Sequence, residues 1–197
     1  GREFSDVEKY SQRKLVKMMF DLAKRVLLEL SNIDFKVYKT ELTIGDTGGK
    51  QAVVPAFQLD IGNGRKVVVT GLVDRTDIYE NSNGKYLRII DYKTGNPNLD
   101  LSTIKYGIGM QLPVYLYLAK NSNKLTNVKV AGFYLQKVLN NEMTVDKTHS
   151  YEQQKKKNLL LQGYSNEDIN ILSEFDKSYM DSNIIKSMKV KNDNSFY

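Results

Sequence analysis

Gly71-Leu-Val-Asp-Arg-Thr-Asp77 and Ile89-Ile-Asp-Tyr-Lys-Thr-Gly95 are the two stretches that decide the fold of this chain. Both have the character of short β-strands, and between them lies Asn81-Ser-Asn-Gly84, a strong turn signal. The sequence therefore predicts a β-hairpin in which the two stretches pair antiparallel.

The residue pairs across this hairpin depend on which two residues form its loop. A loop at Ser82-Asn83 brings opposite charges and two aromatic rings together, and such pairs stabilise a sheet. The pairs are Glu80 with Lys85, Tyr79 with Tyr86 and Asp77 with Arg88, and Asp74 then faces Asp91. A loop at Asn83-Gly84, the preferred type I′ sequence, is the competing register and places Asp74 opposite Lys93. In both registers Asp74, Asp91 and Lys93 lie on the same face of the sheet.

Two carboxylates side by side on a strand pair repel one another unless a cation binds between them. Mg²⁺ prefers oxygen ligands and is usually held by one or two carboxylates with waters and substrate phosphates. The pattern therefore predicts a divalent-metal site at Asp74 and Asp91, with Lys93 beside it to stabilise developing charge or to position water. The alternative is a solvated cross-strand ion pair, because Asp-x-Lys also occurs at Asp34-Phe35-Lys36 without a partner carboxylate.

The first part of the chain predicts one helix followed by antiparallel strands. Residues 6–30 carry apolar side chains at helical spacing, and Ser5 with Glu8 is typical of a capping box. We expect the apolar stripe of this helix to face the core. Strands are expected near 35–44 and 52–61, and a long strand over 66–80 is expected to pair with 86–93 in a meander.

Beyond the hairpin the pattern favours a helix, a buried strand and further helices. Pro113 lies either in the first turn of the helix or at a kink, and the buried strand is expected over 128–137. Two helices separated by Gly163 are expected over 151–180, and residues 181–197 are expected to form a loosely held tail. The predicted fold class is α/β (α+β), with a central mixed sheet containing an antiparallel meander and flanked by helices.

Composition narrows the class of protein. The 197 residues, 41% of them hydrophobic, fit a single domain over 1–197, and Gly1 in place of Met suggests a fragment of a larger protein. The net charge of +6 weakly favours a polyanionic partner. The chain has no cysteine, so it cannot hold a cysteine-ligated iron–sulfur cluster. No apolar run is long enough to cross a bilayer, so we expect a cytoplasmic protein with no membrane partner.

Three further residues are candidates for the site. Gln111 and Tyr115 are four residues apart and share a helix face, where they can contact a phosphate or base edge or orient Lys93; the alternative is a buried tyrosine with a satisfied hydroxyl. Glu41 lies on the first expected strand and is a tentative further metal ligand, although a solvent-facing role is favoured by the sequence alone.

Three motifs in order resemble the PD-(D/E)XK nucleases of the RecB and AddB type: Gly71-x-x-Asp-Arg-x-Asp77, Ile90-Asp-Tyr-Lys-Thr-Gly95 and Gln111-Leu-Pro-Val-Tyr115. The resemblance implies a restriction-endonuclease-like core and Mg²⁺- or Mn²⁺-dependent, exonuclease-type DNA end processing in double-strand-break and recombination repair. It implies that Asp74, Asp91 and the backbone carbonyl of Tyr92 bind the metal and that Lys93 is catalytic. Gln111 and Tyr115 would support the site. DNA, as single strands or duplex ends, and an AddA-like helicase are the implied partners.

Two features depart from that family pattern. The flanking cysteines that bind an iron–sulfur cluster are absent, and no histidine precedes Asp74. Both absences fit a fragment cut inside the flanking elements, and equally an inactive relative. The competing hypothesis is therefore a nuclease-like scaffold that binds DNA or a helicase partner without cutting.

Overall fold

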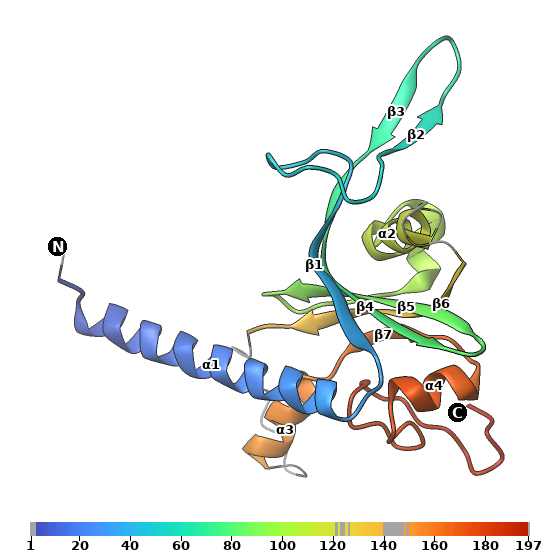
Figure 1. Cartoon of the computed structure of the whole chain (residues 1–197). Coiled ribbons are helices and arrows are strands. Elements are labelled where there is room, and N and C mark those ends of the chain that lie inside the picture. The colour runs from blue at the N-terminus through green and yellow to red at the C-terminus, as the bar shows by residue number, and fades with distance from the viewer. Residues whose placement is uncertain are drawn as a thin grey trace.

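The computed structural model describes residues 3–120, 122, 125, 127–139, 148 and 150–196. Its layers are a central sheet, α2 over one face, and α1, α4 and the C-terminal segment over the other (Figure 1). The elements in chain order are α1 (Asp6–Ser31), β1 (Lys36–Ile44), β2 (Phe57–Asp60), β3 (Lys66–Val69), β4 (Gly71–Asn81), β5 (Gly84–Lys93), the 3-10 helix η1 (Leu101–Tyr106), α2 (Gln111–Lys120), β6 (Val128–Lys137), α3 (Tyr151–Asn158), β7 (Gln162–Ser165) and α4 (Ile169–Phe175).

The central sheet has five strands in the order β1-β4-β5-β6-β7. Only the pair β5–β6 is parallel, and the other three neighbouring pairs are antiparallel. The predicted mixed α/β class is therefore confirmed. The predicted meander needs a correction, because β2 and β3 pair with each other in a separate hairpin that projects from the body, and β1 pairs with β4 instead (Figure 1).

The β4–β5 hairpin has the register predicted for a Ser82-Asn83 loop. Glu80 pairs with Lys85, Tyr79 with Tyr86 and Asp77 with Arg88. The two tyrosine rings stack with their centroids 6.0 Å apart. The competing Asn83-Gly84 register is excluded by this pairing. The pairing also fixes the face of the sheet on which every side chain of the hairpin lies.

α1 begins as predicted and then differs from the prediction. Ser5 and Glu8 form the expected capping box at its start. The apolar stripe, however, is not core-facing along most of its length, since Val7, Tyr10 and Leu15 are 75%, 63% and 48% exposed. The reason is that the N-terminal part of α1 extends beyond the sheet, where no described element covers it (Figure 1). Only the C-terminal end of α1 is anchored to the body, through buried Glu29.

The region after β5 resolves one alternative and corrects two expectations. Pro113 lies in the first turn of α2, which begins at Gln111. Gly163 does not separate two helices; it lies in β7, where a Cβ would collide with the backbone of β6. The segment after Met180 is not loosely held, because Ile184, Ile185 and Val190 are buried and Ile185 forms a β-bridge with Leu161. Its weak periodicity reflects irregular backbone packed by individual side chains.

A buried network of four charged residues joins α1 to the hairpin. Arg88 donates to Glu29 at 2.6 Å and to Asp77 at 2.8 Å, and Arg75 donates to both oxygens of Asp77 at 2.6 and 2.9 Å. All four side chains are at most 3% exposed. Burial lowers the pKa of Arg75, but the hydrogen bonds and charges of Asp77 and Glu29 outweigh it and raise the pKa overall, so this guanidinium stays charged.

We predict that Arg88→Met destabilises the fold by about 3–5 kcal/mol, because it leaves Glu29 and Asp77 buried with only one cation. The matched control is Lys85→Met, which removes an exposed partner of Glu80 on the same strand and is expected to cost no more than about 1 kcal/mol. Urea unfolding followed by circular dichroism measures both. Equal losses in the two variants would contradict a stabilising role for the network.

Candidate metal centre

The hairpin register brings Asp74 and Asp91 together. The last strand pair of the ladder is Arg75 with Ile90, and Asp74 and Asp91 come next on the two strands. The side chain of Asp74 reaches across the pair, where its Oδ2 accepts a hydrogen bond from the backbone N–H of Tyr92 at 2.7 Å. Because side chains alternate along a strand, the two carboxylates lie on the face opposite the Arg75–Arg88 network.

Lys93 and the start of α2 complete the cluster. The Nζ atom of Lys93 lies 2.5 Å from Oδ2 of Asp91 and donates to Oε1 of Gln111 at 3.0 Å. Nε2 of Gln111 lies 3.5 Å from the hydroxyl of Tyr115, one turn further along α2. The structure therefore brings five of the predicted residues into one connected set. Of the roles considered for Gln111 and Tyr115, contact with Lys93 is the one visible in this geometry.

The electrostatics of the cluster fit a cation. Asp91 is only 4% exposed, and its Oδ2 accepts no hydrogen bond of normal geometry from the described residues; its near neighbour is the Lys93 ammonium. Burial raises the pKa of Asp91, and the charge of Asp74 raises it further, while Lys93 opposes both effects. A buried carboxylate that lacks hydrogen bonds and faces a second carboxylate is a suitable ligand for a hard divalent cation.

Glu41 is placed apart from this cluster. It lies on β1 with a positive φ of 51° and forms an exposed ion pair with Lys50. Over the described ranges, with their gaps at 121–149, no three acidic, histidine or cysteine side chains gather as a metal site. Asp74 and Asp91 would thus supply the carboxylates, leaving waters and phosphate oxygens to complete the shell. The roles of Glu41 and of the Tyr92 carbonyl stay predictions.

Gly71 is a part of the site that its motif suggested but did not explain. A Cβ atom at this position would lie 2.8 Å from both the hydroxyl oxygen and ring carbon Cζ of Tyr115. The absence of a side chain at the start of β4 therefore lets the ring of Tyr115 lie against the strand that carries Asp74. Arg75 and Glu29 were not predicted as partners, because a single glutamate near a helix end normally faces water.

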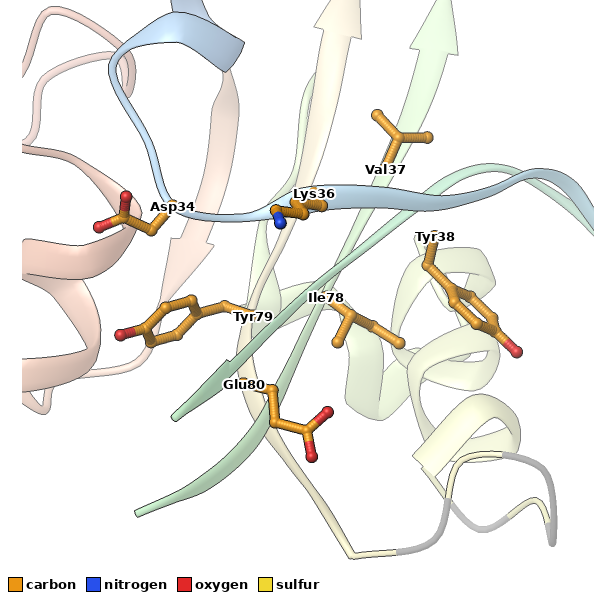
Figure 2. Close-up of a pocket in the computed structure, with 7 residues that line it drawn as sticks. All are labelled: Asp34, Lys36, Val37, Tyr38, Ile78, Tyr79 and Glu80. Carbon is orange, nitrogen blue, oxygen red and sulfur yellow. The ribbon is translucent and has the colours of Figure 1, made fainter. Parts of the chain in front are cut away.

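A cavity of about 580 Å³ lies away from this cluster, between the start of β1 and the end of β4. Figure 2 shows its lining, in which Tyr38 and Tyr79 point in different directions and Glu80 points away from Asp34. None of the predicted site residues lines it. We therefore place the candidate chemistry at the carboxylate cluster and not in this cavity.

The mixed sheet with two carboxylates and a lysine at the end of adjacent strands defines a class, and comparison with known proteins agrees with it. The family model of the PD-(D/E)XK nuclease superfamily matches residues 2–180. This chain belongs to that superfamily, and the mixed α/β core is consistent with its restriction-endonuclease-like fold. Over the described residues, no helix has the length and apolarity needed to cross a membrane.

Curated relatives share one name, which describes the AddB component of an ATP-dependent helicase/deoxyribonuclease. The protein from Carboxydothermus hydrogenoformans is 31% identical over 191 residues, which is 93% of this chain. Those from Thermoanaerobacter sp. (strain X514) and Clostridioides difficile are 31% and 29% identical over 74% and 90% of it. The chain spans only 13–17% of the length of these relatives. The predicted resemblance to the AddB type is confirmed.

We predict that Asp91→Asn stabilises the metal-free protein at neutral pH, with a rise in Tm of about 1–3 °C. The pKa of Asp91 is raised by folding, so the ionised carboxylate is disfavoured in the folded state. The gain should be absent below the unfolded pKa of an aspartate, about 4, and should open as pH rises through the folded pKa. Thermal melts in EDTA from acid to neutral pH measure it; a gap that does not vary with pH would contradict the prediction.

We predict that Gly71→Ala displaces Tyr115 and destabilises the fold by about 1–3 kcal/mol, because the new methyl group overlaps its ring. The matched control is Gly95→Ala, at a glycine where a Cβ would meet nothing within 4 Å. A double-mutant cycle with Tyr115→Ala should show that the cost of Gly71→Ala largely disappears once the ring is gone. Additive losses would indicate that Gly71 acts through something other than Tyr115.

Proposed function

We propose that this chain is a divalent-metal-dependent deoxyribonuclease domain of exonuclease type. It would act in the cytoplasm on DNA ends during double-strand-break processing and recombination repair, with an AddA-like helicase as its partner. The observation that carries the proposal is the connected set of Asp74, Asp91, Lys93 and Gln111 at the end of two paired strands. The names of the curated relatives support DNA as substrate and a helicase as partner.

Asp74 and Asp91 would hold Mg²⁺ or Mn²⁺. When bound, the cation would activate water and neutralise negative charge on the scissile phosphate. Lys93 is only partly buried, with 37% of its side chain exposed, so its ammonium can reach a phosphate oxygen while it stays beside Asp91. In that position it donates a hydrogen bond to the charge that develops on the phosphate.

Gln111 controls the direction of Lys93. Its side-chain oxygen accepts from Nζ, which leaves two ammonium protons for Asp91 and the substrate. Tyr115 in turn lies within reach of the Gln111 amide. The start of α2 is thereby positioned to hold the lysine between a carboxylate and the incoming phosphate.

We predict that Mg²⁺ or Mn²⁺ binding, measured by calorimetry, is lost in Asp91→Ala and kept in Lys93→Met. Cleavage of linear single-stranded DNA should be lost in the first variant and lowered about 10²–10³-fold in the second, since Lys93 acts on charge in the transition state. The matched control is Glu167→Ala, an exposed carboxylate outside the cluster, which should leave binding and cleavage unchanged.

Three outcomes separate the hypotheses. Metal binding with cleavage supports the nuclease. Metal binding without cleavage, also in the presence of a helicase partner, favours the scaffold that binds DNA without cutting. Equal metal binding by the parent chain and Asp91→Ala would contradict the proposed metal centre.

A further inference from the structure

A second surface, on the side of the sheet opposite the carboxylate cluster, is strongly basic. Two cavities of about 380 and 730 Å³ lie along α1 where α3 packs against it. Asp21 and Lys155 line both cavities and form an ion pair of 2.5 Å between the two helices. We call this continuous hollow the α1–α3 groove. It lies on the Glu29 side of the sheet, because α1 enters the core through Glu29 and the network on that face.

The charge of the chain is concentrated in the α1–α3 groove. Its lining carries nine lysines and arginines against two carboxylates, a net charge of +7. The whole chain has a net charge of +6, so the rest of it is close to neutral, at −1. The basic character noted in the sequence is therefore a property of one groove and not of the surface in general.

Most of these cations are not neutralised by neighbours. Lys155 is paired with Asp21, and Lys177 with Asp34 and Glu174. Six others form no ion pair with any residue in the described part of the chain: Arg13, Lys14, Lys17, Lys24, Lys156 and Lys157. Like charges held this close repel one another, and a polyanion that releases its counterions on binding would relieve the repulsion.

Aromatic rings at one end of the groove point to the kind of polyanion. Tyr10 and Tyr151 line the same cavity as Arg13, Lys14 and Lys17, and the tyrosines are 63% and 64% exposed. Cations with exposed aromatic rings between them form the surface that binds single strands, since every base has a π-face to stack on a ring. A duplex hides those faces within its base stack and would use the cations alone.

We propose that the α1–α3 groove binds single-stranded DNA at a site separate from the Asp74–Asp91 centre. The choice of DNA among polyanions rests on the proposed function; the groove itself does not. α1 covers about 27 Å between Tyr10 and Leu28 at a rise of about 1.5 Å per residue, a length that accommodates several nucleotides.

The test compares two triple variants that lose the same charge. Lys14→Gln/Lys17→Gln/Lys156→Gln removes three exposed cations of the groove, and Lys36→Gln/Lys39→Gln/Lys186→Gln removes three exposed cations elsewhere. Binding of a fluorescent oligothymidylate is followed by anisotropy at several salt concentrations in EDTA, so that no cleavage occurs. The groove variant should bind at least about tenfold more weakly, with a salt slope smaller by about 2. The control should keep the parent affinity and slope.

A second comparison tests stacking. Tyr10→Leu/Tyr151→Leu should lower affinity for oligothymidylate on the order of tenfold and leave affinity for an abasic strand of equal length unchanged. If only the lysine variant weakens binding, the groove takes polyanions without reading single strands, and the proposal fails in its choice of ligand. If both triple variants behave alike, the proposal fails entirely and a protein segment becomes the better occupant.

The result is separable from the nuclease proposal. Asp91→Ala should bind oligothymidylate in EDTA as the parent chain does, because the groove does not use Asp91. A chain that binds through the groove but takes up no metal would contradict the proposed function and support the groove. A chain that takes up metal and cuts DNA, with no loss of affinity in the groove variants, would do the reverse.

Discussion

The pairing of Asp77 with Arg88 is the interaction on which the rest of the structure depends. Both side chains are fully buried, so any register that separates them leaves unpaired charges in the core, at a cost of several kcal/mol. A loop at Asn83-Gly84 would place Asp77 opposite Ile90. Its better turn chemistry contributes much less than that loss. The buried pair therefore outweighs the local turn preference and selects the register that is observed.

The same register has opposite consequences on the two faces of the sheet. On one face, two guanidinium groups and two carboxylates form a neutral network that holds α1 on the hairpin. On the other face, Asp74 and Asp91 are neighbours and repel one another, and burial raises the pKa of Asp91. Alternation along the strands thus lets one hairpin carry a stabilising cluster and a destabilising one at once. The strain of the carboxylate pair is tolerated because the network fixes the backbone beneath it.

The sequence was sufficient where structure follows from local pairing. The hairpin register, the capping box at Ser5 and the shared face of Asp74, Asp91 and Lys93 depend on neighbours in two short stretches. It was insufficient where tertiary contacts decide. The apolar stripe of α1 looks the same whether or not another element covers it, and Ile184 and Ile185 are buried individually, without a period that a sequence pattern can detect. The partners of Glu29 are 46 and 59 residues away, on strands that no local signal connects to a helix end.

α1 joins the groove to the metal centre mechanically. Its C-terminal end is fixed by Glu29 to Arg75 and Arg88, and Arg75 directly follows Asp74 in β4. Its N-terminal part extends beyond the sheet and carries one wall of the α1–α3 groove (Figure 1). Because a single helix spans both, a strand in the groove would be held at a fixed distance from the carboxylates and would have to pass around the edge of the sheet to reach them. Such an arrangement separates grip from chemistry: cations at a distance hold the polyanion, and the net negative charge of Asp74, Asp91 and Lys93 keeps the metal centre free for a cation.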